Sequence, residues 1–190
     1  MTRSARKILL FGCAVTIAMT MAACGASAGG RSATPGKGLK GQMRDRADIQ
    51  DAIARFYAAV DAREWDGVAA LMTDPFHLDY SSFGGGDPAD LGPDTIIGGW
   101  KSILPGFEHT HHQLGNMDIE VEDKSATVRC YVTATHVIGD RVWTVVGRYR
   151  NTLVLQGTDW KLSGSQFIFK YQTGATDLPN TAKGRVTKTD

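Results

Sequence analysis

The sequence predicts one α+β domain over residues 45–171, with helices packed on one face of a mostly antiparallel sheet. The first part of this segment has apolar residues at helical spacing, between residues 47 and 72. The second part reads as four long strands, at about 110–121, 126–138, 141–155 and 160–171. Helices followed by a meander of strands are typical of the α+β class. About 127 residues suffice for one hydrophobic core but not for two.

The N-terminal elements are predicted from apolar periodicity and from turn residues. An amphipathic helix from about Ala47 to Ala62 presents one apolar stripe, formed by Ile49, Ile53, Phe56, Tyr57 and Val60. A second short helix ends at Asp74-Pro75, because the residue before a proline disfavours helical backbone. A short strand then runs from Phe76 to Tyr80. A Gly/Pro/Asp loop over residues 84–93 leads to a third helix, for which Asp94 is the predicted cap.

The strand predicted over residues 126–138 carries a histidine on its apolar face. Its even-numbered positions read Ala, Val, Cys, Val, Ala, His, Ile, so His136 is predicted to point into the interior. The odd-numbered positions of the next strand direct Trp143, Tyr149 and Asn151 toward the same interior. An imidazole adds little to the packing of an apolar strand face, so His136 indicates a functional site. A core histidine bonded to the backbone is the alternative.

The strand predicted from residue 110 changes face near Gly115. Its inward residues are even-numbered up to Asn116 and odd-numbered from Met117, which predicts a bulge that re-aims side chains. The pleat therefore allows His112 and His136 to face one cavity. His111 points to the opposite side from His112, so these histidines do not predict a zinc site, and neither metal nor cofactor is expected.

Residues 1–23 have the composition of a signal peptide. A basic start is followed by an uncharged run from residue 8 to 23, which is shorter than a membrane span. The run ends in Met21-Ala22-Ala23-Cys24-Gly25, which resembles a bacterial lipobox, so Cys24 is the predicted lipidated first residue. An ordinary secretory signal is the alternative. The expected location is extracytoplasmic, with the lipid anchored in a bacterial membrane.

The segments on either side of the domain differ from it in composition and charge. Residues 24–44 are predicted to be a flexible tether, and residues 172–190 a polar tail that frays. The domain itself holds 11 Lys and Arg against 18 Asp and Glu, a net charge of −7. Nucleic-acid binding requires a basic surface, so no nucleic-acid partner is expected. Cys130 is the only cysteine within the domain, which excludes an internal disulfide.

Four short motifs in this domain resemble those of a known family. They are Asp-x-x-x-Trp at 61–65, Leu-Asp-Tyr-x-Ser-Phe at 78–83, Thr-x-His-x-x-Gly at 110–115 and Trp-Lys-x-x-Gly at 160–164. With the predicted elements, they resemble the SnoaL-like branch of the nuclear transport factor 2-like superfamily, close to scytalone dehydratase and the bile-acid dehydratases. The resemblance implies a cone-shaped α+β barrel on a curved sheet. It also implies a homodimer through the outer sheet face, where Arg129, Tyr131 and Thr133 lie.

The resemblance further implies a catalytic site and its chemistry. It assigns catalysis to Asp61, Tyr80, His112 and His136, and substrate binding to Tyr57, Trp143, Tyr149 and Asn151. The implied activity is a cofactor-independent dehydratase, isomerase or cyclase acting on a small hydrophobic hydroxy-carbonyl compound. His112 would be the base, Asp61 would orient it, and Tyr80 would donate to the carbonyl oxygen. Val60 departs from the scytalone dehydratase pattern, which has a tyrosine there.

Two other hypotheses stay open at this point. A non-catalytic lipoprotein that binds a small apolar ligand in the same cavity suits the external location, because a biosynthetic dehydratase usually works in the cytosol. A structural module that pairs through its sheet face is the third. Asp61 as a helix-capping carboxylate and Tyr80 as an ordinary strand aromatic are the corresponding structural interpretations. A direct contact between Asp61 and His112 in one cavity would favour the enzyme.

Overall fold

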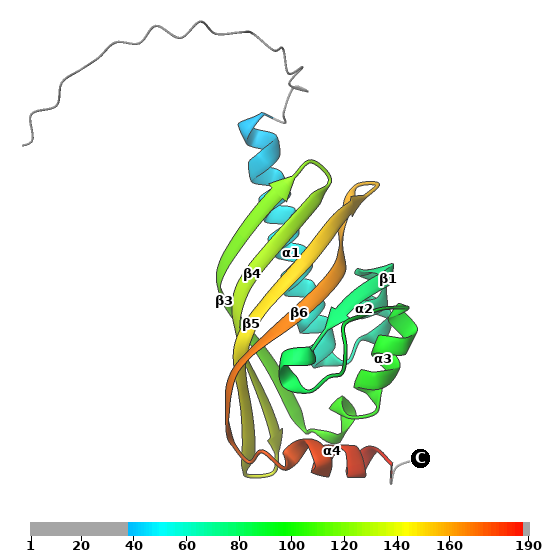
Figure 1. The fold of residues 1–190 in the computed structure, drawn as a ribbon, viewed down its shortest axis with the longest axis vertical. Helices are drawn as coiled ribbons and strands as arrows, with labels where there is room; N and C mark the ends of the chain where they lie inside the picture. The colour runs from blue at the N-terminus through cyan, green and yellow to red at the C-terminus, as the bar shows by residue number, and fades with distance from the viewer. Residues whose placement is uncertain (1–37, 188–190) are drawn as a thin grey trace, which may run out of the picture. The chain divides into compact units, whose positions relative to one another are not determined.

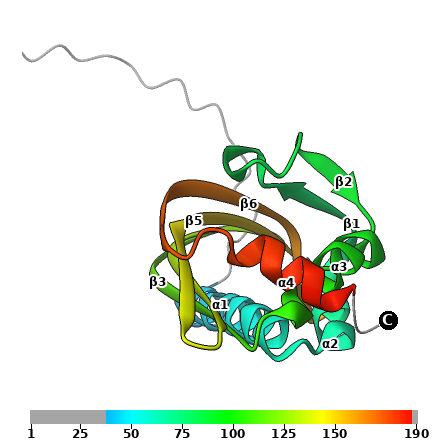
Figure 2. The ribbon, with the colours of Figure 1, turned by 90° about the horizontal axis from the view of Figure 1, so that it is seen from below.

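The computed structural model of the chain describes residues 38–187. Its helices are α1 (Leu39–Ala62), α2 (Trp65–Ala70), α3 (Pro93–Lys101) and α4 (Leu178–Val186). Its strands are β1 (Met72–Asp79), β2 (Ala89–Leu91), β3 (His109–Glu122), β4 (Ser125–Ile138), β5 (Arg141–Gln156) and β6 (Asp159–Gly174). Two short 3₁₀ helices, η1 (Ser81–Phe83) and η2 (Leu104–Gly106), complete the fold. The long strands lie diagonally across α1 (Figure 1), and the sheet curls around this helix (Figure 2).

The strands form a single six-stranded sheet in the order β2-β1-β6-β5-β4-β3. β3 to β6 are a continuous antiparallel meander, and only the β1–β6 pair is parallel. The predicted α+β class, with N-terminal helices on a curved and mostly antiparallel sheet, is therefore confirmed. The sheet is curved but not closed into a barrel, because β2 and β3 are its unpaired edges.

The core lies between α1 and the concave face of the sheet. Ile49 and Ile53 of α1 are fully buried, and Phe56 is 2% exposed. The predicted inward faces are also confirmed, since the even-numbered residues of β4 from Ala126 to His136 and the odd-numbered residues of β5 from Trp143 to Leu153 are buried. Each fully buried large apolar side chain contributes about 1.5–3 kcal/mol, so this interface supplies the main stabilisation.

Helix α1 begins at Leu39, eight residues before the predicted start, and so includes the last part of the predicted tether. The extra turns follow polar contacts and not apolar spacing: Asp45 is buried, and the Arg46 guanidinium donates to the carbonyl of Ile119 over 2.5 Å. No helix within residues 38–187 is long and apolar enough to cross a bilayer. The predicted signal peptide, Cys24 and the rest of the tether lie outside the described residues.

The C-terminal segment differs from the frayed tail that its composition predicts. β6 continues to Gly174, and α4 follows with Leu178 and Ala182 fully buried. Helix α4 lies across the lower end of the sheet (Figure 1), where Asp177 accepts a hydrogen bond from Arg141 over 2.6 Å. Leu178 and Ala182 are the two buried residues of this helix, and their burial docks it on the rest of the fold.

Three smaller differences concern the connections. β1 begins at Met72, and Tyr80 follows this strand instead of ending it. The three-residue strand β2 lies in the predicted loop, paired with β1. Asp94 is not the cap of α3, because Gly92 occupies that position with no side-chain hydrogen bond and Asp94 lies within the first turn. The predicted bulge near Gly115 is confirmed by a register shift between Gly115 and Asp118.

The outer face of β4 has the side chains proposed for dimerisation. Arg129 and Tyr131 are exposed, and Thr133 is half-buried. Arg129 forms ion pairs with Asp118 and Glu120 of β3. These contacts keep the face polar, and the homodimer stays a prediction.

Candidate functional site

A cavity of about 270 Å³ lies between the helices and the inward faces of β4, β5 and β6. Aromatic side chains form most of its wall, including Phe56, Phe83, Trp100, Phe107, Trp143 and Phe167. Polar groups enter from six residues: Tyr57, Tyr80, His112, His136, Tyr149 and Ser165. Small-molecule pockets commonly enclose about 300–1,000 Å³, so this cavity suits a compact and largely apolar ligand.

Asp61 and His112 meet at one wall of this cavity. The last turn of α1 carries Asp61, and β3 brings His112 to it. The ring Nδ1 of His112 lies 2.7 Å from one carboxylate oxygen, and the backbone N–H of His112 donates to the other, also over 2.7 Å. The two side chains are 11% and 17% exposed. Because Nδ1 donates to the carboxylate, Nε2 is the ring nitrogen left for proton transfer.

The charge state of Asp61 follows from these contacts. Burial raises the pKa of the carboxyl, but the hydrogen bonds from the ring and backbone of His112, with the attraction of the ring's charge, outweigh it and lower the pKa below its usual value. Asp61 is therefore ionised at neutral pH and stabilises a protonated imidazole. It does not cap its own helix, since α1 ends at Ala62 and the cap residue Arg63 bonds to backbone carbonyls.

The pair separates the cavity from an outer groove. His112 lines both spaces, whereas Asp61 lines only the groove, together with Gln50, His111 and Met117. The imidazole is thus presented to the interior while its carboxylate partner lies behind it. His111 is exposed on the groove side, as the strand alternation predicts.

His136 lies close to His112 on the inner face of β4. The two ring centroids are 6.2 Å apart with nearly perpendicular planes. His136 also packs on Trp143 and Phe107, with centroid distances of 4.6 and 4.8 Å. Burial, and secondly repulsion from His112, lower the pKa of His136 to about 4, so this ring is neutral near pH 7. Its buried Nδ1 has no hydrogen-bond partner among residues 38–187.

Three tyrosines gather at the cavity wall. Tyr57 and Tyr149 stack with centroids 4.8 Å apart, and Tyr80 packs on Phe167 at 5.7 Å. Burial raises the pKa of all three phenols, and mutual repulsion raises the pKa of Tyr57 and Tyr149 further. All three hydroxyls therefore stay protonated and can donate hydrogen bonds. The hydroxyl of Tyr57 donates to the side-chain oxygen of Asn151 over 3.2 Å.

All but two of the predicted site residues line the cavity, the exceptions being Asp61 and Asn151. Tyr80, His112 and His136 line the cavity together with Tyr57, Tyr149 and Trp143, whereas Asp61 contacts His112 from the outer groove. Asn151 is fully buried and lies behind Tyr57, outside the lining. The sequence does not single out Ser165 of β6, which does line the cavity. Among the described residues no three His, Cys, Asp or Glu side chains group as metal ligands would.

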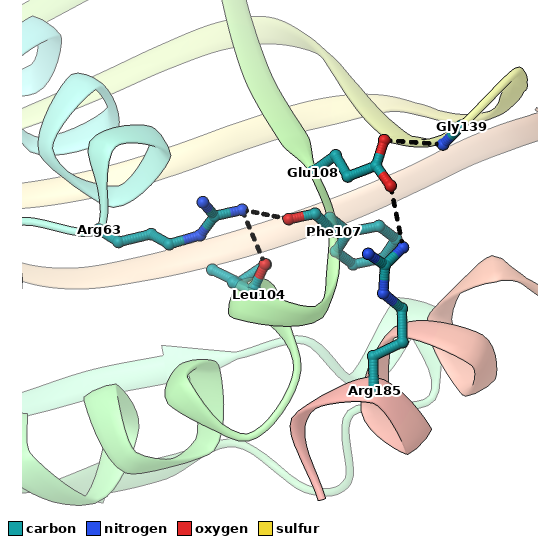
Figure 3. Close-up of polar contacts among 6 residues, drawn as sticks. All are labelled: Arg63, Leu104, Phe107, Glu108, Gly139 and Arg185. Carbon is teal, nitrogen blue, oxygen red and sulfur yellow. Dashed lines mark hydrogen bonds and ion pairs between the residues drawn. The ribbon is translucent and has the colours of Figure 1, made fainter. Parts of the chain in front are cut away.

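Hydrogen bonds from outside the cavity fix the η2 wall. Arg63 Nη2 donates to the carbonyls of Leu104 and Phe107, over 3.1 and 2.6 Å (Figure 3). The next residue, Glu108, accepts from the backbone of Gly139 over 2.9 Å and from Arg185 of α4 over 3.2 Å (Figure 3). The side chains of Leu104 and Phe107 line the cavity, so α1 and α4 together hold this wall in place.

Comparisons with known proteins agree with this architecture. A family model described as a SnoaL-like domain matches residues 41–165. An uncharacterized protein of Mycobacterium tuberculosis is 30% identical over 89 residues, which cover 46% of this chain and 58% of the relative. The match therefore spans a little over half the length of that relative. A Kribbella flavida protein of known structure is 26% identical with a TM-score of 0.67, covering 76% of this chain and 99% of its own.

Two further structures share the fold at lower identity. A Novosphingobium aromaticivorans protein provisionally named a scytalone dehydratase is 19% identical, with a TM-score of 0.62 over 72% of this chain and 91% of its own. A hexachlorocyclohexane dehydrochlorinase, LinA type 2, is 18% identical, with a TM-score of 0.58 over 71% of this chain and 91% of its own. At these identities the likeness concerns the fold, and chemistry has to be argued from the site.

Proposed function

The chain belongs to the SnoaL-like domain family, and on that premise we propose that it is a dehydratase-type lyase. Its substrate would be a small, hydrophobic β-hydroxy carbonyl compound, and the reaction would need no cofactor. The observation that carries this proposal is the Asp61–His112 pair, with 2.7 Å between Nδ1 and the carboxylate, at the wall of an aromatic cavity. A base held in one tautomer beside an apolar chamber is suited to proton abstraction next to a carbonyl.

The reaction divides into two proton transfers at one nitrogen. Nε2 of His112 removes the proton from the carbon next to the carbonyl. The electron pair of that C–H bond forms the carbon–carbon double bond of an enolate, and the π pair of the carbonyl moves to its oxygen. The bond to the β-hydroxyl then breaks as the enolate collapses to a carbon–carbon double bond. The imidazolium of His112 returns its proton to the leaving hydroxyl, which departs as water. The products are an unsaturated carbonyl compound and water, and His112 is regenerated.

The other cavity groups have roles that follow from their charge and placement. Tyr80 stays protonated and donates to the carbonyl oxygen as negative charge develops there. Neutral His136, with a buried and unpartnered Nδ1 within the described chain, holds the leaving hydroxyl. Ionised Asp61 stabilises the imidazolium. The aromatic wall excludes water, which strengthens each of these electrostatic contacts.

The test uses a panel of small aromatic and alicyclic β-hydroxy ketones and esters. Formation of the conjugated product is followed by its ultraviolet absorbance, and exchange of the α-proton is followed by NMR in deuterium oxide. We expect turnover, or at least α-proton exchange, for some members of the panel. Absence of both, with the same compounds shown to bind, would instead support a second function.

That second function is ligand binding without catalysis. The specific observation in its favour is the cavity itself, whose lining is mostly aromatic. In either case we infer from the sequence that Cys24 anchors the protein by lipid on the outside of a bacterial membrane. A binding protein at that place would present a hydrophobic ligand near the bilayer.

A further inference from the structure

Ser165 is a buried polar residue of the cavity wall to which neither the sequence nor the proposed mechanism gives a role. It lies on β6 and is 4% exposed. Its hydroxyl oxygen has no hydrogen-bond partner in the part of the chain that the structure describes. Simple alternation from the buried residues Trp160 and Leu162 would point Ser165 away from the cavity. A local irregularity of the strand brings it inward.

That irregularity is a bulge at the β5–β6 pairing. Leu153 pairs with Leu162, whereas Thr152 pairs with Gly164, so Ser163 is the extra residue. Gly164 allows the close approach, because a Cβ there would lie 2.9 Å from Thr152 Oγ1 and 3.0 Å from the carbonyl oxygen of His77. Beyond the bulge the inward positions become odd-numbered, beginning with Ser165. Bulges that re-aim a side chain are common next to functional sites.

The neighbours of Ser165 form a group of hydrogen-bond donors. Asn151 lies directly opposite on β5, is fully buried, and its amide nitrogen also has no partner among residues 38–187. Tyr80 lines the same cavity as Ser165, and burial raises the pKa of its phenol, so its hydroxyl stays protonated and can donate. The Ser165 hydroxyl and the Tyr80 phenol thus face one cavity, and the Asn151 amide lies opposite Ser165, outside the lining.

Buried hydrogen-bond donors destabilise the fold unless an acceptor pairs with them. Leaving one buried donor unpaired costs on the order of 1–3 kcal/mol, and an alanine at position 165 would avoid that cost. No charged side chain lines the cavity apart from the histidines, and His136 is neutral near pH 7. The missing partner is therefore the oxygen of an uncharged molecule.

We propose that Ser165 and Tyr80 form a subsite that binds the carbonyl oxygen of the ligand, and that Ser165 selects ligands carrying such an acceptor. The position of the carbonyl rests on the proposed function, since it places the oxygen where His112 can act on the neighbouring carbon. The binding preference does not depend on turnover. The ligand class is a compact, neutral ring compound with a ketone or ester carbonyl.

The test compares two probes with one ring skeleton, 1-indanone and indane, of which only the first has a carbonyl. Their dissociation constants are measured by NMR titration for wild type and for Ser165→Ala. We expect the substitution to raise the dissociation constant of 1-indanone about 5- to 10-fold. This factor corresponds to the loss of one hydrogen bond worth about 1 kcal/mol or slightly more. Indane should bind equally well to both proteins.

Ser163→Ala is the matched control, because the Ser163 hydroxyl on the same strand bonds to Thr152 Oγ1 over 3.0 Å and does not line the cavity. It should leave unchanged the ratio of the affinity for 1-indanone to the affinity for indane.

If Ser165→Ala does not fold, Ser165→Cys keeps a side chain of similar size with a weaker donor. It should also lower the affinity for 1-indanone relative to that for indane. An unchanged ratio, an equal loss for both probes, or no binding of 1-indanone to wild type would overturn the proposal. A shifted ratio in a protein without turnover would leave the subsite standing and refute only the lyase.

Discussion

The carboxylate of Asp61 contacts both the ring and the backbone of His112, with each oxygen 2.7 Å from a nitrogen. The backbone contact fixes the carboxylate relative to β3, and the ring contact fixes the tautomer of the imidazole. The contact joins residues 51 positions apart, at the end of α1 and on an edge strand. Packing of α1 on β3 is therefore a precondition of the site.

The first prediction concerns this pair. His112→Ala and Asp61→Asn should each lower turnover of a β-hydroxy carbonyl substrate by about 10²- to 10⁴-fold, since each removes a positioned base or its orienter. The double variant should be little worse than either single one, because the two residues act as a unit. Steady-state kinetics on the best substrate of the panel measures all three.

His111→Ala is the control for that experiment. His111 neighbours the base in sequence but is exposed in the outer groove. It should retain wild-type turnover. A comparable loss in this variant, or additive losses in the Asp61/His112 double variant, would contradict a catalytic unit formed by Asp61 and His112.

The second prediction concerns pH and His136. Its pKa is about 4 in the folded protein, against about 6.5 in an unfolded chain, so between these values only the unfolded state binds the proton. Stability should therefore fall as the pH is lowered from about 6.5 to 4, by up to about 3 kcal/mol from this residue. Urea unfolding at several pH values should show that the free energy of unfolding depends less steeply on pH in His136→Gln than in wild type.

The comparison is one of slopes, because glutamine at a buried site also lowers stability at every pH. His109→Gln, at an exposed position of β3, should keep the wild-type slope. Parallel pH profiles for wild type and His136→Gln would show that His136 is not held in its neutral form.

The long strands could be predicted because alternation over many residues fixes both strand and face. β3, β4 and β5 lie within one residue of their predicted ends. The additions at the edges could not be predicted in the same way. β2 has only three residues, and α4 depends on two apolar side chains, Leu178 and Ala182, whose burial is decided by contacts with η2 and the sheet.

The sequence could predict those site residues that lie on a regularly alternating strand face or in a motif resembling those of the family. The interior position of His136 followed from its strand face, whereas Ser165 was missed because a bulge reversed the parity of β6. A signal for this bulge exists: the apolar residues are even-numbered at Trp160 and Leu162 but odd-numbered at Phe167 and Phe169, with Gly164 between them. The contact of Arg63 with the η2 wall has no comparable signature, since it is made with backbone carbonyls.

The third prediction concerns export. Wild type should fractionate with membranes and have a lipid-modified Cys24 as its first residue, whereas Cys24→Ser should lose the anchor and become soluble. Fractionation with mass spectrometry of the N-terminus measures both. Cys13→Ser, within the same uncharged run, should stay anchored. An unprocessed wild-type precursor in the cytosol would refute the anchor without affecting the cavity chemistry.

The last prediction concerns the packing of α4 on the cavity wall. A Cβ added to Gly106 would lie only 2.0 Å from the carbonyl oxygen of Ala182, so Gly106→Ala must displace α4 or η2. Because Leu104 of η2 lines the cavity, this displacement should disturb the cavity wall. It should also lower the free energy of unfolding by about 1–3 kcal/mol, the usual effect of overpacking.

Gly98→Ala is the matched control. Gly98 lies within α3 with no atom near the added Cβ, so this substitution should stabilise the protein by about 0.5–1 kcal/mol. Urea unfolding gives both free energies, and NMR titration with 1-indanone should show weaker binding only for Gly106→Ala. Unaltered stability and binding in that variant would mean that α4 does not support the wall.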